Sequence, residues 1–595
     1  MHIKKCTRGV CRESEALKET AKGIQERKVD KEILKTLVRM ATKKKKAPVV
    51  YKNAGVLNVF TETVEKSDVA VWGDYIVGVG SYSGESEIDC RGEVIVPAFC
   101  DAHLHVESSM VRPFDFIECA MKSGTLTFIV DPHEAANVKG EAGIKFILDD
   151  TAALPANVYV MLPSCVPAVK GELNGCEYTA GEMKKLISDP RVAGLGEVMD
   201  TAAVSEGEDS MMDKLSLFSS RNADGHMIRC SEETLQALVA CGVCSDHESD
   251  SFEEAYAKYC KGIFIAVREG STARNIRDIL PEFIKRGLPT DNMGFCTDDK
   301  HIKTILDEGH ILHNVNEAMS TGLSFAKAVK MATYNVCRHY GLRRCGAILP
   351  GYRADFLTVR VGKEVELSRV VCHGKDINDY DFDSLRPKAV DPALLNTVNI
   401  APVKSSDLAL KCGTLNDVIE IIPGQLVTNH LRIALPQKDG LFVPNREYAK
   451  LAVIERHKAT GKVGVCAVKG FNIGKCAMAS TVGHDSHNVI VAGDNDADML
   501  RAIGLLKEQG GGFAVVSGED AIVLPLEIMG LMTDDTYVHT AEILEKMHSF
   551  LRQHGLDEET EPFTTLSFLS LPVIPFARLT PSGFIGGEQF GQKKA

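Results

Sequence analysis

Short apolar segments alternate with segments of helical periodicity from about Phe99 to about Leu342. Such an alternation predicts parallel strands joined by helices. After the strand that begins near Phe99, the candidate strands are Thr125 to Val130, Val158 to Leu162, Val192 to Gly194, His226 to Cys230, Val243 to Ser245, Gly262 to Val267 and Met293 to Cys296. Eight strands with intervening helices in about 250 residues predict a (β/α)8 barrel, an α/β fold that we place at residues 98–342.

Polar side chains follow these apolar segments, at the strand ends where the active sites of such barrels lie. His103 and His105 point to the same side of an extended strand. Later strand ends bring Asp131-Pro132-His133-Glu134, Glu197, His226, Ser245-Asp246-His247-Glu248 and Thr297-Asp298-Asp299. Each one alone could be a helix cap, a loop histidine or a solvated carboxylate. In the order His-x-His, carboxylate, His, His, Asp they can hold two metal ions with a shared bridging carboxylate, since imidazole is a common metal ligand.

The segments that flank the barrel predict a small β-sandwich. Residues 49–97 and 343–390 both contain short strand-like runs, and we expect them to pair. The chain would then leave the sandwich, form the barrel and return. Residues 1–48 predict a helical N-terminal segment, because apolar residues recur there at helical spacing.

The region from about residue 400 to residue 595 predicts a separate α+β domain. Asn495 offers a helix N-cap, and the following helix is expected to run to Glu508. The same region contains the cluster His484-Asp485-Ser486-His487-Asn488. This cluster could be a hydrogen-bonded turn or a lid that reaches the mouth of the barrel, and both interpretations stay open at this point.

Composition excludes several classes of partner. The formal net charge of −13 argues against a nucleic-acid surface. The 18 cysteines are dispersed without a disulfide framework, which is typical of a reduced, cytoplasmic protein. No run approaches the roughly 18 to 20 apolar residues of a membrane span, so we expect no membrane partner.

A set of motifs carries a family resemblance. In order, they are DAHLHVESSM, DPHEAANV, GLGEVMD, SDHES, REGSTARN, CTDDKH, EGHI, LPGYRADF and, in the C-terminal region, HDSHNVIVAGDND. Together they resemble the adenine deaminase family of the amidohydrolase superfamily. Two departures stand out. Pro97-Ala98 replaces the usual Pro-Gly before the first strand, and Met227-Ile228-Arg229 replaces the usual Ala-Pro-Gly after His226.

The resemblance implies hydrolytic deamination of adenine to hypoxanthine and ammonia, by a metal-activated hydroxide at a binuclear centre in the barrel. His103, His105 and Asp298 would hold one metal, and His226 and His247 the other. Glu197 would bridge them, and Asp298 would shuttle the proton. Further residues that we expect to act in catalysis, to bind substrate or to support the ligands are Glu134, Glu107, His133, Asp131, His484 and His487. The alternative for Glu134 is a carboxylate stabilised by a helix dipole.

The resemblance favours Mn or Fe for the two divalent ions, with Zn possible for this mixture of ligands. It implies adenine and water as partners, a role in purine salvage and adenine catabolism, and a homo-oligomer, with a dimer favoured. One alternative is another amidohydrolase that acts on a different purine or a cyclic amide, although such relatives often have a bridging lysine that is absent here. The non-enzymatic alternative is an inactive scaffold homologue.

Overall fold

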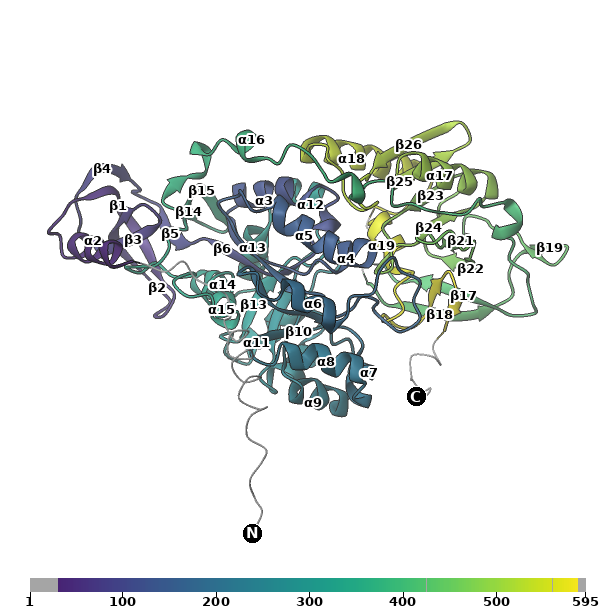
Figure 1. The fold of residues 1–595 in the computed structure, drawn as a ribbon, viewed down its shortest axis with the longest axis horizontal. Helices are drawn as coiled ribbons and strands as arrows, with labels where there is room; N and C mark the ends of the chain where they lie inside the picture. Colours follow the sequence, from purple (N-terminus) through teal and green to yellow (C-terminus); the bar gives the residue numbers. More distant parts are fainter. Residues whose placement is uncertain (1–29, 424, 559, 587–595) are drawn as a thin grey trace, which may run out of the picture.

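The computed structural model describes residues 30–423, 425–558 and 560–586, so residues 1–29 of the predicted N-terminal helical segment lie outside the described residues. Three parts are arranged along the long axis of the molecule (Figure 1): a small sheet, a central barrel and a C-terminal region. Among the described residues, no helix is both long enough and apolar enough to span a bilayer.

The central part is the predicted (β/α)8 barrel. Eight strands form one sheet in the order β13 to β6, and each neighbouring pair runs parallel. A parallel bridge from Leu104 to Asp298 joins the first strand end to the last. The strands are β6 (Phe99–Leu104), β7 (Thr125–Val130), β8 (Asn157–Leu162), β9 (Val192–Val198), β10 (Asn222–Gly225), β11 (Val243–Asp246), β12 (Phe264–Arg268) and β13 (Met293–Cys296).

Helices surround this sheet and bury their apolar faces against it, while side chains such as Cys100, Ile129 and Met161 fill the interior. The helices are α3 (Pro113–Lys122), α4 (His133–Lys139), α5 (Glu141–Asp150), α6 (Ala180–Leu186), α7 (Thr201–Glu206), α8 (Asp209–Leu217), α9 (Glu232–Ala240), α10 (Phe252–Tyr259), α11 (Ile276–Lys285), α12 (Ile302–Glu308), α13 (Ile311–Ser320), α14 (Phe325–Met331) and α15 (Tyr334–His339).

One strand lies earlier than the sequence predicts. The expected strand from His226 to Cys230 is instead β10, which ends at Gly225. Met227 is apolar and fully buried, as a strand residue would be, but it packs beyond the strand end. The shift places His226 directly after the strand, where a barrel presents its functional side chains.

Strands from the two flanking segments pair with each other, as predicted. They form one connected eight-stranded sheet over a shared core that includes Tyr51, Ile95 and Phe356, because β5 pairs with both β1 and β14. The elements are α2 (Lys31–Ala41), β1 (Ala47–Asn58), β2 (Thr63–Trp72), β3 (Tyr75–Gly80), β4 (Gly84–Asp89), β5 (Val94–Pro97), β14 (Phe356–Val361), β15 (Val365–Cys372) and β16 (Lys375–Asp376). Helix α16 (Phe382–Leu385) follows in the connection to the C-terminal region.

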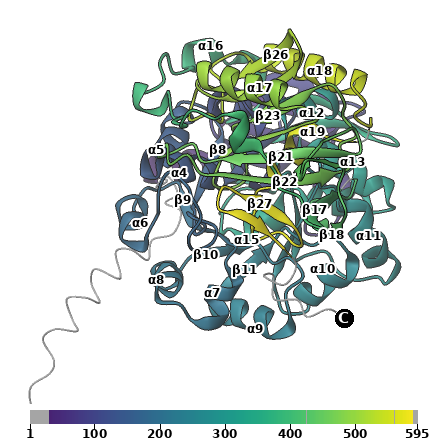
Figure 2. The ribbon, with the colours of Figure 1, turned by 90° about the vertical axis from the view of Figure 1, so that its right-hand side faces the viewer.

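The C-terminal region has its own eight-stranded mixed sheet and lies across the barrel (Figure 2). The predicted helix after Asn495 is confirmed as α17 (Asp496–Glu508), and the Asn495 side chain accepts a hydrogen bond from the Asp498 N–H. The strands are β17 (Asn416–Ile421), β18 (Thr428–Ile433), β21 (Tyr448–Ile454), β22 (Val463–Lys469), β23 (Ala477–Ser480), β24 (Val489–Gly493), β25 (Gly512–Ser517) and β26 (Asp520–Pro525). Two short hairpins and two further helices complete it: β19 (Gln437–Lys438), β20 (Leu441–Phe442), β27 (Arg578–Thr580), β28 (Gly583–Ile585), α18 (Tyr537–Gln553) and α19 (Pro562–Phe568).

Candidate metal centre and active site

Six predicted ligand residues converge at the carboxyl ends of the barrel strands, and all six are buried. They are His103 and His105 from the end of β6, Glu197 within β9, His226 after β10, His247 after β11 and Asp298 after β13. The backbone of Asp298 is held against the first strand, because its N–H donates to the His103 carbonyl. The closing seam of the barrel therefore places the last predicted ligand beside the first.

One group of ligand atoms surrounds Glu197 Oε1. The Nε2 atoms of His103 and His105 both lie 3.0 Å from this oxygen and 3.1 Å from each other. Asp298 Oδ1 lies 3.1 Å from the Nε2 atom of His105. All these atoms face the same small volume.

The second group lies on the other oxygen of the same carboxylate. Glu197 Oε2 is 2.8 Å from Nδ1 of His226 and 3.8 Å from Nε2 of His247. Within the described part of the chain, Glu197 is therefore the carboxylate that contacts both pairs of histidines, which is the position expected of a bridging ligand.

The donor atoms fit two divalent cations. Bonds of about 2.0–2.2 Å to nitrogen and oxygen ligands place neighbouring ligand atoms about 3 to 3.5 Å apart, as they are around Glu197 Oε1. Glu197 Oε1 is buried without a hydrogen-bond partner, and so is Nε2 of His226. The Nε2 atoms of His103 and His105, 3.1 Å apart, can both bind the same cation.

The electrostatics of the cluster keep its carboxylates ionised. Burial raises the pKa of Glu197, but the charges of His247 and His103 hold that pKa well below its ordinary value. Burial likewise opposes ionisation of Asp298, and hydrogen bonds from His103 and His105 hold its pKa well below the ordinary value. Burial lowers the pKa of His103, but the Glu197 carboxylate outweighs it and raises that pKa to about 10. The protein thus concentrates negative charge where cations would bind.

Asp131 supports the ligands without facing the centre of the cluster. Its Oδ2 accepts a hydrogen bond of 2.8 Å from the Glu197 N–H, and its carbonyl lies 2.9 Å from Nδ1 of His105. An imidazole held through its second nitrogen presents the first one in a defined orientation. Asp131 is therefore placed to orient two ligands.

The C-terminal loop from Thr481 to Asn488 reaches the barrel mouth. Nδ1 of His484 lies 2.8 Å from Glu134 Oε1, and Asp485 Oδ1 lies 3.6 Å from Nε2 of His133. Of the two interpretations of this cluster, the structure thus favours a segment that covers the barrel. His487 stays within the loop, where its Nδ1 accepts from the Gly483 N–H.

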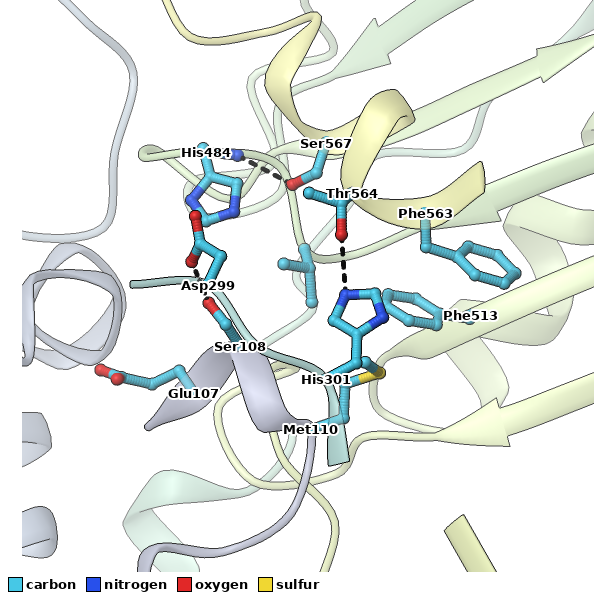
Figure 3. A pocket seen from close by; sticks show the side chains of 11 residues that line it. Glu107, Ser108, Met110, Asp299, His301, His484, Phe513, Phe563, Thr564 and Ser567 are labelled. Atoms are coloured by element: carbon cyan, nitrogen blue, oxygen red, sulfur yellow. Dashed lines mark hydrogen bonds between the residues drawn. The ribbon is translucent and has the colours of Figure 1, made fainter. Parts of the chain in front are cut away.

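Figure 3 shows the side of this interface around His484. His484 points toward Asp299 and Ser108 of the barrel, and Glu107 lies beside Ser108, farther from His484. The cavity there measures about 10 Å³, which is room for about one water molecule. Glu107 accepts a hydrogen bond from the Ala135 N–H, and burial together with the Glu134 charge raises the pKa of Glu107 to about 7.

Sequence reasoning gave no role to three residues that contact the predicted set: Arg268, Glu248 and Asp485. Arg268, the last residue of β12, donates from Nη1 to Asp298 Oδ2 at 2.9 Å and also pairs with Glu248. Asp485 was quoted only as part of its loop. The strand-end rule could have found Arg268, because β12, like β8, was a barrel strand without an assigned residue, whereas no local signal indicates the contact of Asp485.

Comparison with known proteins agrees with this geometry. The model of the amidohydrolase family matches residues 94–377, and the barrel is that of an amidohydrolase. A model described as adenine deaminase C-terminal domain matches residues 425–591. A crystal structure of an adenine deaminase is 15% identical and covers 56% of this chain and 99% of its own, with a TM-score of 0.44.

Curated relatives match most of the chain. The adenine deaminase of Desulfitobacterium hafniense strain Y51 is 42% identical over 92% of this chain and 97% of its own length. Adenine deaminase 2 of Carboxydothermus hydrogenoformans is 41% identical over 94% of this chain and 98% of its own length. The chain therefore belongs to the adenine deaminase family.

Proposed function

We propose that this protein deaminates adenine hydrolytically to hypoxanthine and ammonia at a centre of two divalent metal ions. The observation that carries the proposal is the position of Glu197, whose two carboxylate oxygens face two different pairs of histidines. His103, His105 and Asp298 would hold one ion, and His226 and His247 the other. Mn or Fe is the metal that we favour for the two sites. Divalent cations in such a site lower the pKa of water to about 7 and so supply a nucleophile at neutral pH.

Asp298 is the proposed proton shuttle. One of its oxygens faces His103 and His105 at 3.6 and 3.1 Å, and the other accepts from Arg268. An ionised carboxylate in this position can take a proton from the attacking water and pass it to the leaving amine. General acid–base catalysis of this kind contributes about 10²–10⁴-fold to a rate.

Glu134 and His133 are proposed to orient the purine ring, with Glu107, His484 and His487 in support. Burial raises the pKa of Glu134, but the His484 charge lowers it to about 2, so the carboxylate is ionised at neutral pH. An ionised carboxylate only accepts hydrogen bonds, which suits a ring N–H of adenine. A cytoplasmic location, a role in purine salvage and a dimeric state stay predictions.

The test is adenine turnover by the purified protein loaded with Mn or Fe, followed as ammonia release alongside metal analysis. We expect about two metals per chain and turnover that is abolished in Glu197→Gln and lowered by at least about 100-fold in Asp298→Asn. Two bound metals without adenine turnover would contradict the substrate assignment. A protein that binds no metal would instead support the inactive scaffold.

A further inference from the structure

A groove of about 270 Å³ lies beside helix α2, at the end of the molecule opposite the C-terminal region (Figure 1). One wall is the outer face of α2, with Leu34, Val38 and Ala41, and the other includes residues 350–352. The volume is below the range of about 300–1,000 Å³ that is usual for small-molecule pockets. The groove therefore suits a few side chains of a docked segment better than an entire small ligand.

Helix α2 has two apolar stripes, one buried and one open to solvent. Leu37 and Met40 are buried in a core that α2 shares with strands β1, β2 and β3. Leu34 and Val38, four residues apart on one face of the helix, are 45% and 60% exposed. Together with Ala41 they form a second stripe at helical spacing. An exposed apolar stripe beside a groove indicates a surface that another molecule covers.

The surroundings of the groove are basic, although the chain is acidic overall. Residues 31–46 contain seven lysines and arginines and a single acidic residue, Glu32, whereas the whole chain has a formal net charge of −13. Glu32 pairs with Lys35 at 2.6 Å. Arg344 adds a further positive charge to the lining of the groove. The basic character is therefore concentrated on this face of the molecule.

Four lysines at residues 43–46 directly follow α2 and are exposed. The backbone holds them close to the helix, because the N–H groups of Lys44 and Lys45 both donate to the Arg39 carbonyl. A ligand that covers the open stripe would therefore gain from negative charge at its edges, since complementary charges across an interface favour the correct partner.

Like charges argue against two other occupants of the groove. A second copy that used the same face would place its basic residues opposite those of the first, and like-charge contacts destabilise an interface. Residues 1–29 contain eight basic and four acidic residues, so their net charge has the same sign as that of the face. A lipid surface is flat on this scale and would not fill a concave groove. A complementary protein segment is thus favoured.

We propose that the groove beside α2 is a docking site for an acidic amphipathic segment of a partner protein. Apolar side chains at helical spacing would fill the groove, and the acidic side chains next to them would face the lysines at residues 43–46. Amphipathic helices bind hydrophobic grooves in this way, through anchors three or four residues apart. None of the groove residues is among the six predicted metal ligands, so the inference goes beyond the proposed function and does not depend on it.

Docking at this groove should be weak and sensitive to salt. The open stripe lies on a helix of 11 residues, which fits the weak, transient class of protein interfaces. We therefore expect a Kd on the order of micromolar. Raising NaCl from about 0.1 M to about 1 M shortens the Debye length from about 10 Å to about 3 Å and should weaken the binding.

The experiment measures binding of a fluorescein-labelled helical peptide to the full-length protein by fluorescence anisotropy. The peptide has about 18 residues, or about five turns, with leucine at every third or fourth position and glutamate at most others. A peptide with the same leucines and lysine in place of glutamate is the charge control. We expect saturable binding of the acidic peptide and at least about tenfold weaker binding of the basic one.

Val38→Asp tests the groove, because it places a negative charge on the open stripe. We expect this variant to raise the Kd of the acidic peptide at least about tenfold. Val38→Ser removes the apolar contact without a new charge and should weaken binding by a smaller factor. Val538→Asp changes a valine of α18 that is 51% exposed and is the matched control. All three variants should keep the midpoint of thermal unfolding, since exposed positions contribute little to stability.

Four results would overturn the inference. The first is the lack of saturable peptide binding, or binding that Val38→Asp leaves unchanged. Equal binding of the acidic and basic peptides would remove the role of charge. Binding to phosphatidylglycerol vesicles that Val38→Asp abolishes, without binding of the peptide, would assign the face to a lipid surface. A dimer that dissociates in Val38→Asp, measured by sedimentation, would assign it to a second copy. Failure of the proposed function is distinct, because none of these measurements depends on adenine turnover.

Discussion

Gly196 shows how closely the bridging ligand depends on a single neighbouring position. A Cβ atom added there would lie 2.2 Å from Asp131 Oδ2. That same oxygen accepts the hydrogen bond from the Glu197 N–H. Any side chain at residue 196 would therefore displace Asp131, and with it the orientation of Glu197 and His105.

Gly196→Ala should consequently lower metal occupancy and adenine turnover by at least about tenfold, because misplaced supporting residues typically cost 10–100-fold in metal affinity. Metal content after dialysis and ammonia release measure the effect. Gly181→Ala is the matched control, since its Cβ would have its nearest neighbour at 3.6 Å. Equal behaviour of the two variants would contradict the role given to Asp131.

At the scale of elements, the connection between β23 and β24 joins the C-terminal region to the catalytic barrel. His484 stacks on Phe568 of α19 with ring centroids 4.3 Å apart, so its ring is fixed by its own region. Asn488 Nδ2 donates to the Leu173 carbonyl of the barrel at 2.8 Å. A rigid loop therefore presents His484 to Glu134.

His484→Ala should raise the pKa of Glu134, because the neighbouring imidazole charge that counters burial would be lost. Below the raised pKa, Glu134 becomes protonated and can no longer accept as a carboxylate. The acidic limb of the kcat/KM profile against pH should then shift to higher pH, with a lower plateau. His539→Ala, at a half-exposed position on α18, should leave the profile unchanged. An unshifted profile in His484→Ala would rule out this coupling.

At the scale of the whole molecule, a buried arginine ties the barrel to the C-terminal region. Arg112 is fully buried and pairs with buried Asp150 of α5 and with Asp534 of the C-terminal region. Asp534 also accepts from Arg386, which pairs with Asp115 of α3. The two parts thus share one network of ion pairs.

Arg112→Met should destabilise the protein by about 3–5 kcal/mol, because Asp150 would remain buried without a counter-charge. Thermal unfolding should show a lower midpoint temperature, and the double variant Arg112→Met/Asp150→Asn should recover part of the loss. Arg432→Met removes an exposed arginine and should change stability by no more than about 0.5 kcal/mol.

A second contact across the same interface predicts a pH dependence. His301 of the barrel and His548 of α18 lie 3.4 and 3.2 Å from Glu561 Oε1. Burial raises the pKa of Glu561, but these histidines lower it to about 2. Because the pKa of Glu561 is depressed in the folded state, its charge stabilises the fold at pH values above the ordinary pKa of 4.5. This stabilisation is lost as the pH falls toward 2.

Glu561→Gln should therefore lower the midpoint of thermal unfolding most at pH 5 to 7, with a loss of up to about 3 kcal/mol. The difference from the wild-type protein should shrink below pH 4.5. Glu542→Gln, at an exposed position of α18, is the control. A difference that stays constant with pH would show that the charge of Glu561 does not stabilise the interface.

Much of the barrel and the principal candidate ligands could be predicted from sequence, because both depend on local patterns. Apolar runs of strand length alternate with helical periodicity, and polar residues such as His103, Glu197 and Asp298 directly follow or end those runs. The rule that parallel barrel strands share one functional edge then brings them together without any coordinates. The strand before His226 was misplaced because buried Met227 continues an apolar pattern beyond the strand end.

Only the tertiary structure decided which residues meet across distant parts of the chain. The contact of His484 with Glu134 and the bond from Arg268 to Asp298 both join segments far apart in sequence. Such contacts depend on how the C-terminal region packs on the barrel, which no local periodicity encodes. The sequence by itself determined the barrel and the chemistry at its strand ends, and packing decided what surrounds that chemistry.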